Sequence, residues 1–254
     1  MPKIVALLIV VFLTSPLWAA SSAPLSDAQA VAFAAQSVNA MTGGNAIVDV
    51  TLTGSVTRIA GSDQQTGTAT LLAKGLVESR IDLNLSGGNR SEIRNGNASN
   101  LGNWVGPDGA IHTIALHNCF TDTSWFFPAL GSLAAVTANP NVVLLYAGQQ
   151  ASLQHIQAYT YNPGLPNAPA LSTVDFYLDA KTLLPSVVMF NEHPDNDQTL
   201  NIGVQVMFSD YRKVNGAMIP FHIQRYVNNS LTLDVQLTSA SLNLGVADSN
   251  FNVR

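Results

Sequence analysis

The dominant pattern along the chain is an alternation of apolar and polar residues, which is typical of strands that bury one face. It is clearest over residues 173–243, where apolar residues recur at every second position through several segments. Turn signals at residues 179–182, 215–216 and 228–229 separate these segments. The pattern predicts an antiparallel meander of five strands with one apolar and one polar face.

The same alternation occurs in the first half of the chain. The apolar positions that share a face are Val48, Val50, Leu52 and Val56, followed later by Ile81, Leu83 and Leu85. Residues 61–65 turn the chain between these two runs, and residues 107–109 turn it again. Together with the meander, these segments predict a mainly β fold of about eleven antiparallel strands.

Two segments break the alternation and predict helices. In the first, Ser26 and Gln29 form a capping-box pattern, and Gly43 ends the run. Its apolar positions at helical spacing are Val31, Ala34, Ala35, Val38 and Met41. The second is a short mid-chain helix that begins near Pro128 and ends at Asn139, before a proline.

Residues 1–23 have the three parts of a secretory signal: a positive start at Lys3, an apolar run over residues 4–13, and small residues up to Ala23. The run is too short for the roughly 20 apolar residues that span a bilayer, so removal is favoured over anchoring. No cysteine stands at the end of this segment to carry a lipid anchor. Residues 24–254 then predict one domain, periplasmic or secreted, in which residues 162–170 form a loop.

Composition narrows the classes of function. Hydrophobic residues make up 47% of the chain and charged residues 11%, which excludes intrinsic disorder. The net charge is −5 and no basic stripe occurs, so we expect no nucleic-acid partner. Cys119 is the only cysteine, and its neighbours Asn118 and Phe120 supply no cation, which favours a buried, unreactive thiol.

No pattern in the sequence supports catalysis or a metal site. The spacing of His112 and His117 places them on opposite faces of a strand, and His222 falls on the polar face of its strand. The acidic run over residues 192–197 lacks the spacing of a calcium loop and predicts a solvated hairpin loop. No nucleophile elbow or phosphate-binding loop occurs. We therefore expect a protein that is not an enzyme and carries no cofactor.

An aromatic and aliphatic segment at residues 125–136 is the candidate binding feature. Either it plugs the core, or it forms a lid over a concave apolar face that the two helices leave uncovered. An acyl chain entering such a groove gains about 0.8 kcal/mol per buried CH₂, before association costs are subtracted. The candidate ligand-binding residues are Trp104, Trp125, Phe126, Phe127, Leu130, Leu133, Val204, Val206, Phe208, Phe221 and Ile223.

Three motifs near the C-terminus resemble those of a known family. Residues 176–185 contain a D-x-x-T-x-x-P turn, and residues 210–220 contain a Y-x-x-V-x-G-x-x-x-P hairpin. Residues 242–251 close the chain as N-x-x-x-x-D-x-x-F. In this order the motifs are similar to those of the LolA/LolB-like superfamily of periplasmic lipoprotein-localisation proteins.

The resemblance implies a half-open antiparallel β-barrel whose helices cover a concave face that takes up acyl chains. It implies a carrier for a lipid, a lipoprotein or another hydrophobic ligand, with a membrane-associated protein as a further candidate partner. Such carriers fasten the lid with an arginine; Arg58 and Arg80 lie in early strands, but neither stands in a matching motif. The alternatives are a non-catalytic sensor or interaction module on the same fold, and a secreted β-sandwich hydrolase with two carboxylates.

Overall fold

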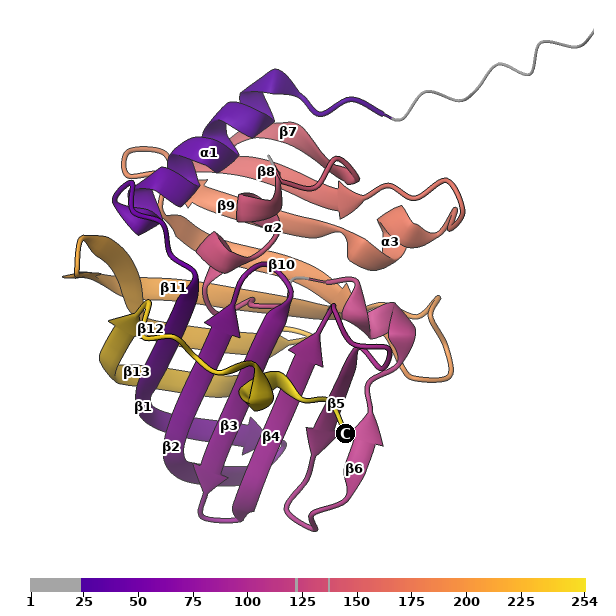
Figure 1. Ribbon diagram of the computed structural model, residues 1–254, viewed down its shortest axis with the longest axis vertical. Coiled ribbons are helices and arrows are strands. Elements are labelled where there is room, and N and C mark those ends of the chain that lie inside the picture. The colour runs from indigo at the N-terminus through magenta and orange to yellow at the C-terminus, as the bar shows by residue number, and fades with distance from the viewer. Residues whose placement is uncertain (1–23, 122, 137) are drawn as a thin grey trace, which may run out of the picture.

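The computed structural model describes residues 24–254, apart from residues 122 and 137. The predicted secretory signal, residues 1–23, lies outside the described residues. Within the described chain, thirteen strands form one antiparallel sheet that curls around its apolar face (Figure 1). A mainly β, half-open barrel was predicted and is confirmed, but the sheet has thirteen strands where about eleven were predicted.

The sheet consists of two meanders that meet where the first and last strands pair. The first half contains β1 (Asp49–Ala60), β2 (Asp63–Lys74), β3 (Glu78–Leu85), β4 (Gly88–Asn95), β5 (Gly102–Val105) and β6 (Ile111–Thr113). The second half contains β7 (Val142–Gln150), β8 (Leu153–Thr160), β9 (Val174–Asp179), β10 (Pro185–Glu192), β11 (Ile202–Val214), β12 (Ala217–Val227) and β13 (Ser230–Leu242). The spatial order is β6-β5-β4-β3-β2-β1-β13-β12-β11-β10-β9-β8-β7.

The predicted five-strand meander corresponds to β9–β13, and its turns lie where the sequence indicates. Asp179 accepts hydrogen bonds from the Thr182 amide at 2.8 Å and hydroxyl at 3.0 Å, which fixes the first turn. Asn215 and Asn228 have positive φ angles of 48° and 46°, which suit tight hairpins and which asparagine tolerates. In the first half of the chain, Val48 was predicted to share the buried face of a strand, but it is 57% exposed and precedes β1.

The N-terminal helix is α1 (Ala28–Thr42); Ala34 and Met41 of its predicted apolar face are buried, whereas Ala35 is exposed. Its N-cap is Asp27, whose carboxylate accepts the Gln29 amide at 2.8 Å, so the predicted Ser26 cap is wrong. Ser26 instead accepts the amide of Leu144 at 3.1 Å and fixes the chain to β7. The helix buries a narrow face of small residues together with one methionine. These buried residues are Ala30, Ala34, Ser37, Met41 and Thr42.

The predicted mid-chain helix consists of two single turns, η2 (Pro128–Leu130) and α2 (Ser132–Ala135), against which α1 packs. A further short helix, α3 (Ala168–Ser172), overlaps the end of the segment 162–170 that was predicted to be a loop. Ser172 explains this helix, because its hydroxyl donates to the Ala168 carbonyl and accepts the Thr160 amide of β8. Two further turns are η1 (Leu116–Cys119) and η3 (Asp248–Phe251).

The hydrophobic core lies between the concave face of the sheet and the segment that contains η2 and α2. Phe126, Phe127 and Leu133 are 0% exposed there. They pack with inward-facing strand residues such as Phe176 and Ile219, which are also 0% exposed. The interior beneath α1 is therefore filled by the protein's own side chains.

Candidate functional site

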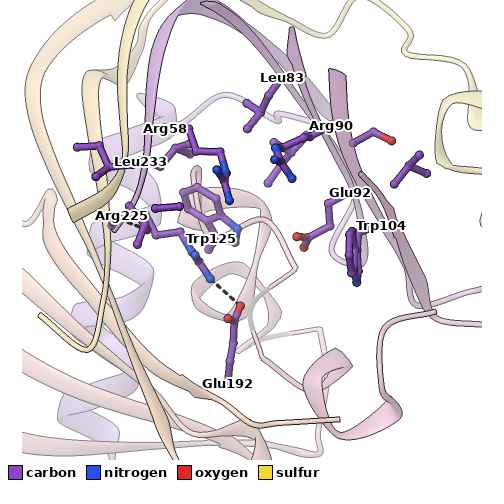
Figure 2. A pocket seen from close by; sticks show the side chains of 15 residues that line it. Arg58, Leu83, Arg90, Glu92, Trp104, Trp125, Glu192, Arg225 and Leu233 are labelled. Carbon is purple, nitrogen blue, oxygen red and sulfur yellow. Dashed lines mark hydrogen bonds and ion pairs between the residues drawn. The ribbon is translucent and has the colours of Figure 1, made fainter. Parts of the chain in front are cut away.

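A cavity of about 450 Å³ opens near the C-terminal end of β1 (Figure 2). Its volume lies within the range of roughly 300 to 1,000 Å³ that is usual for small-molecule sites. Seven strands and the segment before η2 contribute to its wall. The lining residues are Arg58, Ile59, Ala60, Ile81, Leu83, Arg90, Ser91, Glu92, Trp104, Val105, Trp125, Glu192, Arg225, Thr232 and Leu233.

One wall of the cavity is apolar. Leu83 of β3 and Leu233 of β13 are 9% and 8% exposed and belong to the same core cluster as Trp125. The indole of Trp125 packs edge-on against Phe126, with ring centroids 5.6 Å apart. The tryptophan thus forms the boundary between the filled interior and the cavity.

The other wall carries charge, and strand periodicity explains its position. Arg90, Glu92 and Arg94 alternate along β4, so their side chains share one face of that strand. The β3–β4 register places Arg90 opposite Leu83 and Glu92 opposite Ile81, which are inward residues. β4 therefore directs three charged side chains into the concave side of the half-barrel.

Two glutamates and two arginines form a connected ion-pair network at the cavity. Arg94 is 7% exposed and donates from Nε to Glu92 Oε1 at 2.7 Å. Glu192 of β10 accepts from Arg225 of β12 at 2.7 Å, and its Oε1 lies 3.9 Å from Arg94 Nη2. Arg225 also lies over the ring of Trp125, 5.9 Å from its centroid. Each carboxylate in this network has an arginine within hydrogen-bonding distance.

Burial and ion pairing act in opposite directions on the pKa values of Glu92 and Arg94. Burial raises the pKa of Glu92, but the charge and hydrogen bond of Arg94, with Arg225, outweigh it and leave the pKa below its usual value. Burial alone would lower the pKa of Arg94, but Glu92 and Glu192 outweigh this effect and leave that pKa above its usual value. Two positive and two negative charges therefore compensate one another.

A short segment joins this network to the β10–β11 connection. Arg94 Nη1 donates to the Asn118 carbonyl at 2.6 Å. The Asn118 side chain donates to the His193 carbonyl at 2.7 Å and accepts the His193 amide at 2.8 Å. His117 adds a contact from Nε2 to the Pro194 carbonyl at 3.0 Å. These bonds fix the side of the half-barrel where its two halves meet.

Arg58 and Arg90 stand outside the ion-pair network. Within the described part of the chain neither arginine has an ion pair, and the buried Arg90 Nε lacks a hydrogen-bond partner. Burial and the charge of Arg90 lower the pKa of Arg58, and Asp63 opposes them. Figure 2 shows both side chains entering the space beside Trp125.

Two of the eleven predicted ligand-binding residues line the cavity. Trp125 is 5% exposed, and Trp104 is 40% exposed and stacks on His112 with ring centroids 4.0 Å apart. The other nine are at most 6% exposed and lie in the core; they are Phe126, Phe127, Leu130, Leu133, Val204, Val206, Phe208, Phe221 and Ile223. Their contact with a ligand stays a prediction, and it would require them to leave this packing.

Five charged cavity residues were not among the predicted ligand-binding residues, although their spacing contains a signal. Glu192 continues the inward run of Val188 and Phe190, and Arg225 continues that of Phe221 and Ile223. In each strand, an alternating apolar run ends in a charged residue on the same face. The other three charged residues are Arg58, Arg90 and Glu92.

The remaining expectations about polar residues need three corrections. His112 lies in β6 and His117 in η1, so they do not share a strand. His193 is 4% exposed, so the acidic run is not a wholly solvated loop. Cys119 was predicted to be buried with no cation nearby, but it is only partly buried, and Arg94 acts on it electrostatically; burial nevertheless raises the pKa of its thiol above the usual value. Within the described ranges, no group of three or more His, Cys, Asp or Glu side chains could hold a metal ion.

Solved structures share this arrangement of strands and helices. A putative outer membrane lipoprotein-sorting protein domain from Vibrio parahaemolyticus superposes with a TM-score of 0.55 at 10% identity, covering 88% of this chain and 96% of that one. A LolA superfamily protein from Nitrosomonas europaea gives 0.56 at 8% identity, covering 88% and 97%. The chain has the LolA-like fold.

A DUF1329 family protein from Desulfovibrio piger gives a TM-score of 0.55 at 11% identity, with 88% of this chain and 97% of that one covered. No protein-family model matches the sequence, and no curated protein does. The predicted resemblance is thus confirmed at the level of the LolA-like fold. Across the described residues, no helix is both long enough and apolar enough to cross a membrane.

Proposed function

We propose that the protein is an exported, non-catalytic carrier that binds the apolar chain of a lipid, a lipoprotein or another amphiphile. The observation that supports this most directly is the cavity of about 450 Å³, bounded by Leu83, Trp125 and Leu233, on the concave side of a LolA-like sheet. One structure with this fold is named as a lipoprotein-sorting protein domain. The proposed setting is the periplasm or the exterior of the cell, after removal of residues 1–23.

The physical basis is the transfer of an apolar chain from water to a site that is already formed. Each methylene that leaves water contributes about 0.8 kcal/mol, and a rigid wall limits the ordering cost of binding. The wall is rigid because Leu83 and Leu233 are buried strand residues, while Trp125 is fixed against Phe126. A single chain can therefore bind with useful affinity and still dissociate.

The proposal is tested with a variant in which a large side chain fills the cavity. Ala60 lines the cavity at the end of β1 and is exposed, so Ala60→Trp can occupy the opening without displacing core residues. Ala35→Trp, on an exposed position of α1, adds the same side chain elsewhere and is the matched control. Delipidated mature protein and both variants are titrated calorimetrically with decanol.

We expect the wild type and Ala35→Trp to bind one decanol per chain, and Ala60→Trp to bind at least about tenfold more weakly, a change of about 1.4 kcal/mol. Mass spectrometry of protein exported by a bacterial host should also find one amphiphile per chain. Absence of decanol binding to the wild type, or equal binding by all three proteins, would contradict the proposal.

A further inference from the structure

The cavity has an excess of positive charge on a protein whose net charge is negative. The four-membered network of Arg94, Glu92, Glu192 and Arg225 is neutral, because two arginines compensate two glutamates. Arg58 and Arg90 then remain as two positive charges at the cavity wall. The whole chain carries a net charge of −5, so this local surplus opposes the overall charge.

The fold holds these two arginines together in spite of their repulsion. Arg58 lies on β1 opposite Leu233 of β13, and Arg90 lies on β4 opposite Leu83 of β3. Their leucine partners belong to the apolar wall, so each arginine extends from a position next to buried carbon. The two β-strand positions are fixed by ladder hydrogen bonds, and neither arginine can leave the concave side without a change of register.

The described surroundings leave both arginines able to bind a further group. Arg90 Nε is buried and has no hydrogen-bond partner among the described residues. Asp63 attracts Arg58 electrostatically, but its carboxylate accepts a hydrogen bond from Gln65 at 2.7 Å. A buried guanidinium donor without a partner is costly, and an anionic oxygen that accepts from it removes that cost.

We propose that Arg58 and Arg90 bind the anionic oxygens of an amphiphile's head group while its apolar chain lies against Leu83, Trp125 and Leu233. Phosphate and carboxylate share the required chemistry, because both offer two oxygens that the guanidinium fork can bind at the same time. Glu92 and Glu192 do not repel the head group strongly, since each is compensated by its own arginine. This inference rests on the proposed function and specifies the ligand class of the same cavity.

The test compares ligands that have one chain and different heads. Delipidated mature protein is titrated with decyl phosphate, decanol and decyltrimethylammonium below their micelle concentrations, and with inorganic phosphate alone. Decyl phosphate should bind about tenfold or more tightly than decanol, and the ammonium should bind most weakly. The preference for decyl phosphate should decrease with added salt, because screening weakens partly exposed charge pairs.

The arginines are tested with the double variant Arg58→Gln/Arg90→Gln. It should bind decyl phosphate and decanol with affinities that differ by less than about threefold. Arg212→Gln is the matched control, because Arg212 is 55% exposed on β11, pairs with Asp210 and does not line the cavity. Melting curves establish that each variant is folded, and the salt dependence of the wild type provides the test if the double variant is not.

The outcomes separate this inference from the proposed function. Equal wild-type affinity for decyl phosphate and decanol, or a preference that survives in the double variant, would overturn the inference and leave a carrier for neutral chains. Inorganic phosphate that binds as tightly as decyl phosphate would also overturn it, in favour of a site for free anions. Failure of every decyl ligand to bind would overturn the proposed function itself.

Discussion

Glu192 of β10 lies 3.9 Å from Arg94 of β4, although six strands lie between β4 and β10 in the sheet order. The contact exists because the sheet curls until β4 and β10 face each other across its concave side. Arg94 also reaches Asn118, whose side chain bonds to His193 next to Glu192. We call this set of contacts the seam. It bounds the cavity on the side where the half-barrel has no backbone pairing of its own.

Loss of the Glu192 charge should weaken the seam. Glu192→Gln removes the ion pair with Arg225 and leaves Arg94 with only Glu92, so we expect the free energy of unfolding to fall by about 1–3 kcal/mol. Urea denaturation measures this change. Asp210→Asn removes an exposed pair and should leave the urea midpoint nearly unchanged. Equal losses in the two variants would show that the seam is no stronger than a surface ion pair.

Acid should destabilise the protein partly through Glu92. Arg94 holds the pKa of Glu92 below its usual value in the folded state, against the opposing effect of burial. As the pH falls, Glu92 is therefore protonated first in the unfolded chain, near pH 4.3. The stability that the charged Glu92 contributes is lost as the pH falls further, through its pKa in the folded protein. Urea midpoints between pH 7 and pH 3 should fall less steeply in Glu92→Gln than in the wild type. Parallel pH curves for the two proteins would contradict this assignment.

The buried aromatic residue Phe127 should contribute more to stability than an exposed apolar residue. Phe127 is 0% exposed, so Phe127→Ala leaves a cavity and should lower the free energy of unfolding by about 3–5 kcal/mol. Leu200 is 56% exposed, and Leu200→Ala should change it by about 0.5 kcal/mol or less. Denaturant titration of both variants checks the difference. A small effect at Phe127 would mean that the segment is a movable lid rather than part of the core.

The thiol of Cys119 should react slowly in the folded protein. Burial raises its pKa above the usual value, and Arg94 only partly offsets that effect. The thiolate fraction at pH 7 is therefore lower than in a free thiol, whose pKa is about 8.5. Rates of alkylation by iodoacetamide should rise only at a pH above that value. In urea, the pH dependence of the rate should become that of a free thiol. A rate profile centred near pH 8.5 in the native protein would be inconsistent with this burial.

The sequence predicts the second half of the fold better than the first. Between Val174 and Leu242 nearly every inward position is apolar, so the strand period is unambiguous. In β4 the inward positions are Arg90, Glu92 and Arg94, and the buried Ile93 faces the other way. A hydrophobic period cannot identify such a strand, since the residues that face the interior are charged.

The residues that line the cavity could be predicted only in part. Apolarity selects Phe126 and Phe127 as readily as Trp125, but only three-dimensional packing decides which side chains fill the core and which line free space. The charged lining depends on contacts between distant strands, such as that of Glu192 with Arg225. Charged residues that end an apolar alternating run are the sequence signal that would have identified this wall.

The most direct test of a chain-binding cavity uses its two tryptophans. Of the three tryptophans in the sequence, Trp18 lies in the predicted signal, so the mature protein would retain only Trp104 and Trp125, and both line the cavity. Titration with a fatty acid brominated along its chain should quench their fluorescence saturably at one ligand per chain, with less quenching in Trp125→Phe. Quenching that never saturates, and that matches the quenching of free tryptophan at the same concentration of the brominated fatty acid, would contradict binding in this cavity.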